Sequence, residues 1–213
     1  MAKSAGMLSI VDAVTSLAGI DLQVDAWGAD VVYSGTQKCL SSLPGIAPIT
    51  FSADAVEMIA TRKRKVQSWF LDMNLIMGYW GEGAKRAYHH TAPINAIYAL
   101  HEALLMLEEE GLQASFARHK ANHLVLTEGL SELGLKLAVS EPWRLPQLNA
   151  VLIPDGQDDA AIRNALLREF DLEVGAGLAE SAGKQWRIGL MGSSCNTTNI
   201  NRCLTALEAV LRQ

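Results

Sequence analysis

Short apolar runs alternate with polar and glycine-containing stretches through the first part of the chain. Three of them occupy Met7–Val11, Val31–Ser34 and Ile46–Phe51. The first of them, Met7–Val11, lacks the alternation of a half-exposed strand, and an unbroken apolar run is typical of a parallel strand buried on both faces. We therefore expect a mostly parallel sheet here. Because a central strand needs a neighbour on each side, we also expect a further portion of protein before Met7–Val11.

Apolar residues three and four positions apart predict a helix that runs to about Glu110. At its start, Thr91 suits an N-cap and Pro93 suits the first helical turn. The apolar positions on one face are Ile94, Ile97, Leu100, Leu104 and Leu107. The other expected helices are Ser52–Arg64, Trp69–Trp80, Leu112–Leu133, Asp158–Phe170 and Asn196–Leu211.

The second half of the chain predicts a smaller α+β domain, because short strand-like pieces alternate there with helices. The boundary is expected near residue 111, where Gly111 interrupts the helical pattern. It divides the chain into the remainder of a large domain, residues 1–110, and a small C-terminal α+β domain, residues 111–213. The strand-like pieces of the second part are Leu135–Val139, Asn149–Ile153, Leu172–Val174 and Gln185–Ile188.

Composition excludes several classes of partner. The 213 residues are 49% hydrophobic and 19% charged, so the chain can bury a sizeable core. The net charge of -5 and a single short basic run, Arg62–Lys65, argue against a nucleic-acid partner. No run approaches the ~18 apolar residues of a membrane span. Three cysteines without disulfide or metal-ligand spacing indicate a reducing compartment, so we expect a cytoplasmic protein.

A lysine follows the second apolar run. Lys38 lies just after a turn at Gly35, at the carboxyl end of the expected strand. Ligands of open α/β sheets bind at this edge. A lysine amine there can form a Schiff base with a carbonyl cofactor. On spacing alone, a solvated surface lysine explains the pattern better.

A carboxylate ends the first apolar run in a similar way. If the two strands are parallel neighbours, Asp12 and Lys38 face one crevice. A pyridoxal phosphate site needs this pair, because the lysine holds the aldehyde and the carboxylate keeps the ring nitrogen protonated. The alternative for Asp12 is an aspartate that caps a turn.

Four segments in this order resemble the class V aminotransferases of fold type I, most of all the alanine–glyoxylate and serine–pyruvate branch. They are Val11–Leu17, Tyr33–Lys38, Tyr88–Thr91 and Trp186–Leu190. The resemblance covers nearly the whole chain. It implies the C-terminal part of a fold type I large domain, with a mostly parallel sheet, followed by the small α+β domain. It also implies that a long N-terminal portion of such enzymes is lacking.

The resemblance implies pyridoxal 5'-phosphate as cofactor and gives the matching residues their roles. Lys38 would carry the cofactor as a Schiff base and move the proton between substrate and cofactor carbons. Asp12 would hold the ring nitrogen, and Val14 would pack under the ring. Gln37 would reach the cofactor phosphate.

Two further segments would complete the site. By resemblance, Tyr88 and Thr91 reach the cofactor phosphate of the neighbouring subunit, which implies a homodimer. A core tyrosine and an N-cap threonine are the alternative. Arg187 would bind the substrate α-carboxylate with its two-pronged guanidinium, and an internal salt bridge is its alternative.

Other polar motifs are weaker candidates for a functional site. The adjacent pair His89 and His90 point different ways, so no metal site is expected. The glycine-rich piece Gly175–Gly183 indicates a flexible connection rather than a phosphate loop. Cys195 has no histidine near in sequence and is a poor candidate for a nucleophile.

The implied activity is a ping-pong transamination from alanine or serine to glyoxylate or another 2-oxo acid. A lyase or decarboxylase of the same fold would use the same residues. A catalytically incomplete fragment, acting as a dimer-forming or binding module, is the alternative from another class, and the early position of Asp12 favours it. The sequence gives neither the amino donor nor whether Met1 is the natural start.

Overall fold

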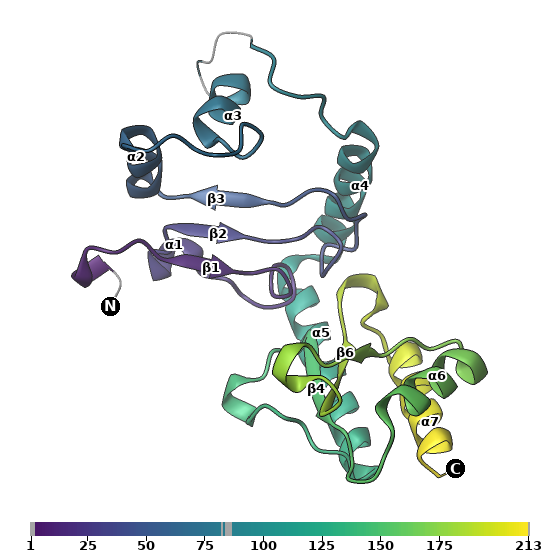
Figure 1. Ribbon diagram of the computed structural model, residues 1–213. Helices are drawn as coiled ribbons and strands as arrows, with labels where there is room; N and C mark the ends of the chain where they lie inside the picture. Colours follow the sequence, from purple (N-terminus) through teal and green to yellow (C-terminus); the bar gives the residue numbers. More distant parts are fainter. Residues whose placement is uncertain (1–2, 82, 84–86, 213) are drawn as a thin grey trace.

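The computed structural model describes residues 3–81, 83 and 87–212. Its first part carries a three-stranded sheet in the order β1-β2-β3 (Figure 1). The strands are β1 (Ile10–Asp12), β2 (Val31–Tyr33) and β3 (Ile49–Phe51). β1 and β2 are parallel, which confirms that the first two apolar runs are parallel neighbours. β3 is antiparallel to β2.

β1 differs from its prediction in two respects. It begins at Ile10 rather than Met7, and it stands at one edge of the sheet with β2 as its neighbour. The Ile10 side chain is 71% exposed, and Asp12 is exposed as well. The prediction of a strand buried on both faces is therefore wrong for the part of the chain that the structure describes, where two of the three residues of β1 are exposed.

The helices beside this sheet are α1 (Val24–Trp27), α2 (Ala53–Thr61) and α3 (Met73–Trp80). Ser52 caps α2 as predicted, because its hydroxyl accepts a hydrogen bond from the Ala55 N–H at 3.2 Å. α2 is shorter than predicted and ends at Thr61. α3 starts later than predicted, because the Asp72 carboxylate accepts from the Asn74 N–H and sets the N-terminus there.

The two long helices are α4 (Ile94–Glu110) and α5 (Leu112–Glu132). They follow one another through Gly111, which is the C-cap of the first and the N-cap of the second. The predicted cap of α4 is wrong: Pro93 occupies the N-cap position, and Thr91 lies two residues before it. The apolar stripe of α4 is largely exposed, with Ile94 at 53%.

The C-terminal part has an antiparallel sheet in the order β4-β6-β5, with helices α6 and α7. Leu137 makes only an isolated bridge to Val151, so the predicted strand 135–139 is wrong. The predicted strand 172–174 is also wrong, and the pairing starts at Gly175, inside the piece interpreted as a flexible connection. The elements are β4 (Leu148–Leu152), α6 (Asp159–Phe170), β5 (Gly175–Ala176), β6 (Gln185–Gly189) and α7 (Thr197–Leu211).

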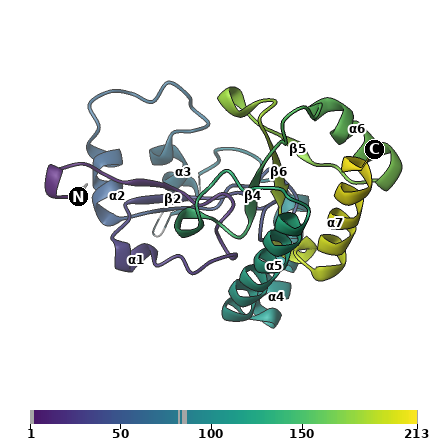
Figure 2. The same cartoon turned by 90° about the horizontal axis from the view of Figure 1, so that it is seen from below.

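Four short 3₁₀ turns complete the described secondary structure: Lys3–Ala5, Glu141–Trp143, Ala179–Ser181 and Gly192–Ser194. Among the described helices, none is both long and apolar enough to cross a bilayer. The main hydrophobic core lies within residues 126–210 and centres on the fully buried Trp186. Helices α5 and α7 pack side by side there (Figure 2).

A smaller core joins the two parts of the chain. Ala18, Cys39 and Leu40, which follow β1 and β2, are buried against Leu100 and Leu107 of α4. Met191, just after β6, packs against the same cluster. This cluster brings the turns after β1 and β2 beside the end of β6, and these three segments form the candidate site.

Candidate active site

Lys38 lies in a turn that its neighbours close by hydrogen bonds. The buried Thr36 hydroxyl donates to the Leu43 carbonyl at 2.6 Å, so the loop after β2 folds back on itself. The Ser41 N–H donates to the Lys38 carbonyl at 2.9 Å. The lysine side chain is half-buried, and none of the ion pairs among the described residues includes it. The backbone is therefore fixed while the amine is left available.

A hollow of about 350 Å³ opens beside this turn. Residues that follow β2 form one side, and residues at the end of β6 form the other. The lining is Gln37, Lys38, Ser41, Ser42, Gly189, Met191, Ser193 and Ser194. The Ser42 hydroxyl is buried and has no hydrogen-bond partner among the described residues. A polar wall with an unpaired hydroxyl and a free amine suits a polar ligand.

Arg187 lies two residues before Gly189 on β6, so both side-chain positions face the same side of the sheet. The pattern of burial agrees, since Trp186 and Ile188 face the core. The Arg187 Nε donates to the Ala176 carbonyl at 2.7 Å. No ion pair among the described residues includes Arg187, so the alternative of an internal salt bridge finds no partner there.

Asp12 ends β1 directly opposite Tyr33 of β2. The Tyr33 hydroxyl donates to Asp12 Oδ2 at 2.9 Å, and the Val14 N–H donates to Oδ1 at 2.9 Å. These bonds hold the carboxylate at the carboxyl edge of the sheet, where it is exposed. The hydrogen bond to Asp12 raises the pKa of the Tyr33 phenol, because the phenol must keep its proton to donate this bond.

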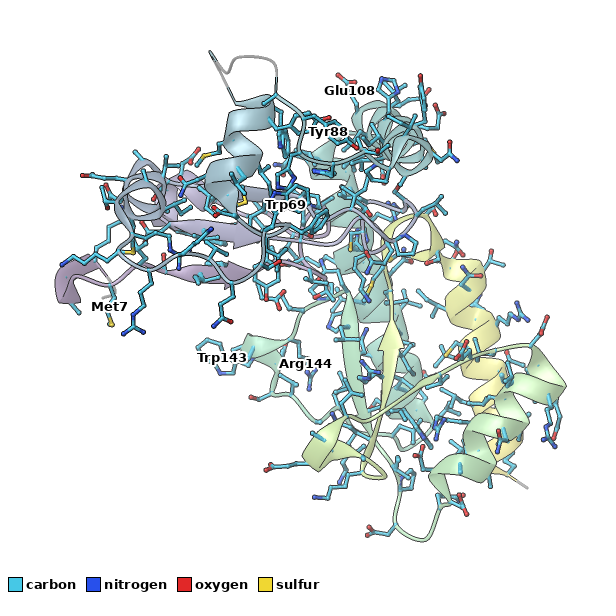
Figure 3. The ribbon with its side chains drawn as sticks, turned by 45° about the horizontal axis from the view of Figure 1, so that its top comes forward. Met7, Trp69, Tyr88, Glu108, Trp143 and Arg144 are labelled. Atoms are coloured by element: carbon cyan, nitrogen blue, oxygen red, sulfur yellow. The ribbon has the colours of Figure 1, made fainter. Side chains whose placement is uncertain are left out.

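Tyr88 and Thr91 come together, with their hydroxyl oxygens 2.9 Å apart. Tyr88 is 75% exposed and is therefore not the core residue of the alternative interpretation. The neighbouring His89 is buried, and its ring stacks on Trp69 with centroids 3.9 Å apart. Figure 3 places Trp69 and Tyr88 in the region between α3 and α4. This pair of hydroxyls faces outward.

The structure thus gathers the predicted residues only in part. Gln37 and Lys38 line the hollow, whereas Arg187 lies on β6 two residues before the lining residue Gly189 and is not itself part of the lining. Within the described residues, the lining contains none of the other candidates, which are Asp12, Val14, Tyr88 and Thr91.

The serine-rich turn Gly192–Ser194 is the part of the site that sequence reasoning missed. The next residue, Cys195, is fully buried, and burial raises the pKa of its thiol, so it is no candidate for a nucleophile. In the sequence, a glycine and two serines come three to five residues after Gly189, the last residue of β6, but no local pattern indicates that they meet the Lys38 turn. The described residues contain no group of three or more side chains able to hold a metal ion.

Solved structures share this arrangement over nearly the whole chain. The alanine–glyoxylate aminotransferase from Nostoc sp. superimposes with a TM-score of 0.94 at 48% identity, over 99% of this chain and 55% of that one. The ureidoglycine–glyoxylate aminotransferase from Bacillus subtilis superimposes with a TM-score of 0.92 at 38% identity, over 99% and 54%. The fold is therefore the α/β fold of the fold type I aminotransferases.

The chain belongs to the class V aminotransferases, whose family profile matches residues 1–185. It is 41% identical over 208 residues to alanine–glyoxylate aminotransferase of Felis catus, which covers 97% of this chain and 50% of that protein. It is 37% identical over 222 residues to (S)-ureidoglycine–glyoxylate transaminase of Bacillus subtilis, over 96% and 53%. The chain spans about half the length of these curated relatives.

Proposed function

We propose that this chain carries the lysine half of a transaminase site, which exchanges an amino group between a small amino acid and a 2-oxo acid. The observation that carries the proposal is the hollow that joins the Lys38 turn to the end of β6, the strand of Arg187. The cofactor aldehyde needs an amine, and the substrate carboxylate needs a cation within reach of the same bound substrate. Alanine as donor and glyoxylate as acceptor are supported by the names of the relatives, whereas serine as donor rests on the family resemblance of the sequence motifs.

The residues present fit pyridoxal 5'-phosphate. Its aldehyde needs an amine that is not held in an ion pair, and Lys38 forms none with the described residues. The unpaired Ser42 hydroxyl, buried in the lining, gives a further polar contact. When bound, the cofactor supplies an electron sink that stabilises negative charge on the substrate carbon. Lys38 moves the proton to and from that carbon, because its amine is the base that borders the hollow.

The other candidates take supporting roles in this proposal. Asp12 keeps the ring nitrogen protonated, and its position is supported by the bonds from Tyr33 and Val14. Val14 packs under the ring, and Gln37 reaches the phosphate from the wall of the hollow. Arg187 binds the substrate carboxylate with its terminal nitrogens, because Nε is occupied by the Ala176 carbonyl.

We further propose a homodimer in which Tyr88 and Thr91 serve the cofactor phosphate of the partner subunit. Two adjacent hydroxyls that face outward suit a phosphate from another molecule. In this proposal residues 1–110 belong to the cofactor-binding large domain and residues 111–213 form the small α+β domain. A cytoplasmic location is supported by three cysteines that are all free.

Borohydride trapping tests the proposal. The purified chain is mixed with pyridoxal phosphate, reduced, digested and mapped by mass spectrometry. We expect the reduced adduct on Lys38 well above other lysines, and its loss in Lys38→Arg. Lys136→Arg, in the C-terminal part, is the matched control and should change nothing. An adduct spread evenly over many lysines, or none, would refute the assignment of Lys38.

An assay with amino donors and 2-oxo acid acceptors separates the chemistries of this fold. A transaminase requires both substrates, whereas a lyase or decarboxylase releases product without the acceptor. A second candidate, a dimer-forming module without turnover, is favoured by the exposed apolar stripe of α4. Lys38 labelling together with absent turnover for every substrate pair would favour this module.

A further inference from the structure

Helix α5 contacts both sides of the candidate site through its first turns. The Ser115 hydroxyl is buried and donates to the Ala18 carbonyl at 2.8 Å, in the turn that follows Asp12. One turn further on, the ring Nε2 of His119 lies 3.1 Å from the backbone nitrogen of Gly192. Gly192 opens the serine-rich turn that lines the hollow. One helix end therefore reaches the two segments that flank the site.

The partners of His119 determine which nitrogen carries its proton. The Gly192 N–H is only a donor, so Nε2 must accept and carry no hydrogen. Nδ1 lies 2.7 Å from the Ser115 carbonyl, which is only an acceptor, so Nδ1 carries the proton. His119 is fully buried, which favours this neutral form. The side chain is thus a fixed link between the helix backbone and the Gly192 backbone.

Gly192 in turn lies directly on the backbone of the Lys38 turn. A Cβ at this position would overlap the Ser41 hydroxyl and would come within 3.0 Å of the Cys39 carbonyl oxygen and 3.2 Å of the Lys38 carbonyl oxygen. The next residue, Ser193, donates its N–H to the Ser41 hydroxyl at 2.8 Å. The position of Gly192 therefore sets the position of the Lys38–Ser41 backbone.

Neighbouring residues of α5 hold the same turn from outside. Arg118 Nη1 donates to the Gly192 carbonyl at 2.8 Å and to the Cys195 carbonyl at 3.0 Å. Asn122 Nδ2 also donates to the Cys195 carbonyl at 3.0 Å. These bonds satisfy carbonyl oxygens, whereas His119 alone among them accepts a backbone N–H. Arg118 and Asn122 act only as donors to this turn, so they cannot replace the hydrogen-bond acceptor that His119 provides for the Gly192 N–H.

We infer that His119 is a positioning residue for Lys38. Through Gly192 it fixes the turn that directs the lysine amine into the hollow, without touching the amine itself. This role rests on the proposed function of Lys38. Loss of the acceptor would let Gly192–Ser194 move away and would widen the range of Lys38 orientations.

Three substitutions at His119 separate this role from simple packing. The amide oxygen of Gln stands where Nε2 stands, so His119→Gln keeps the acceptor for Gly192. Asn is too short to reach Gly192, and Leu has no acceptor. His123→Leu is the matched control, because His123 is a buried histidine one turn along α5 that bonds Asn149 on β4 instead. It should lower the melting temperature without disturbing the site.

Two measurements on the full chain test the inference. Amide hydrogen exchange, read at the Gly192 N–H, should accelerate at least tenfold in His119→Leu and His119→Asn and stay near wild type in His119→Gln and His123→Leu. Borohydride trapping with pyridoxal phosphate should show a several-fold loss of selectivity for Lys38 in His119→Leu and His119→Asn, and no such loss in His119→Gln or His123→Leu. If His119→Leu does not fold, His119→Asn against His119→Gln gives the same comparison.

The outcomes distinguish this inference from the proposed function. If wild type shows no selective adduct on Lys38, the proposed function fails, and with it the role of His119. If wild type shows the selective adduct and His119→Leu and His119→Asn retain it, or if His119→Gln is as impaired as Asn, the positioning role is overturned while the function of Lys38 stands.

Discussion

The phenol of Tyr33 donates a hydrogen bond of 2.9 Å to the carboxylate of Asp12, across the parallel pair β1 and β2. The register makes this contact possible, because the two residues stand directly opposite each other at the carboxyl ends of their strands. A charged acceptor makes this a stronger bond than one between neutral groups. The pair therefore orients the carboxylate before any ligand is present.

Ionisation of Tyr33 should report this contact. The bond to Asp12 raises the pKa of the phenol, so Tyr33 should ionise at higher pH than an ordinary tyrosine. Asp12→Asn removes the negative charge and should bring that pKa down toward its usual value. The ionisation of Tyr33 can be followed by absorbance titration of wild type and of Asp12→Asn. Subtracting the titration of the same protein with Tyr33→Phe leaves the signal of Tyr33 alone. An unchanged Tyr33 titration in Asp12→Asn would show that the bond is not formed in solution.

Stability should fall as the solution is made mildly acidic. Burial lowers the pKa of His119 and of His123 below the ordinary value of 6.5. Below pH 6.5 the unfolded chain takes up protons that the folded chain does not, so the free energy of unfolding decreases by at most about 1.4 kcal/mol per pH unit for each histidine. This contribution is fully present above pH 6.5.

Urea unfolding between pH 7.5 and 5 measures this slope. His119→Gln and His123→Gln should each flatten it, and the double variant should flatten it most. The lowered pKa of Asp30, which accepts a backbone hydrogen bond from Ser9, acts only at more acidic pH and does not overlap this window. A slope that both single variants leave intact would contradict the prediction.

Gly192→Ala should destabilise the protein more than a glycine substitution at a comparable backbone angle. Gly192 has φ +56°, and its Cβ would overlap the Ser41 hydroxyl. Gly183 has φ +70°, and an added Cβ there would have no atom within 4 Å. Gly183→Ala therefore measures the cost of the backbone angle alone, about 1 kcal/mol. We expect roughly 1–3 kcal/mol more at Gly192 from overpacking.

Denaturant titration of Gly192→Ala and Gly183→Ala gives the difference directly. Adding Ser41→Ala to Gly192→Ala removes the nearest clash and should restore part of the loss. Equal destabilisation by the two alanine substitutions would mean that Gly192 does not lie against the Lys38 turn.

Arg187→Lys should weaken binding of amino acid substrates about tenfold or more, because lysine lacks the two-pronged donor geometry. Arg144→Lys is the matched control, since Arg144 also donates Nε to a backbone carbonyl, that of Val139, but lies just after the turn Glu141–Trp143 and not on β6. Steady-state kinetics should show a raised KM for the amino donor in the first variant alone. Similar KM values in the two variants would remove Arg187 from substrate binding.

Elements governed by local signals were predicted well. α6 and α7 begin within one residue of their predicted starts, because Asp158 and Asn196 accept hydrogen bonds from the backbone N–H three residues on. α4 ends at Glu110 as predicted, where Gly111 follows. The motifs around Lys38 and Asp12 were also visible, since strand ends and turns are encoded in neighbouring residues.

The exposure of β1 and the far wall of the hollow were not predictable in the same way. Both depend on contacts between segments distant in sequence. The Ser193 N–H donates to the Ser41 hydroxyl although the two residues are 152 positions apart in the sequence. No local sequence pattern indicates such a contact. The burial of Gln147 is not predictable from local sequence either. Its side chain is fully buried, and its amide nitrogen and oxygen have no hydrogen-bond partner among the described residues.

The shared residue between α4 and α5 has a mechanical consequence. Gly111 joins the two helices without a helical residue between them, and the 21 residues of α5 extend about 31 Å from it. A rotation of about 5° at Gly111 displaces the far end of α5 by about 3 Å but His119 by only about 1 Å. Such a rotation would move Ser115 and His119, which lie in the first turns of α5, much less than the far end of the helix.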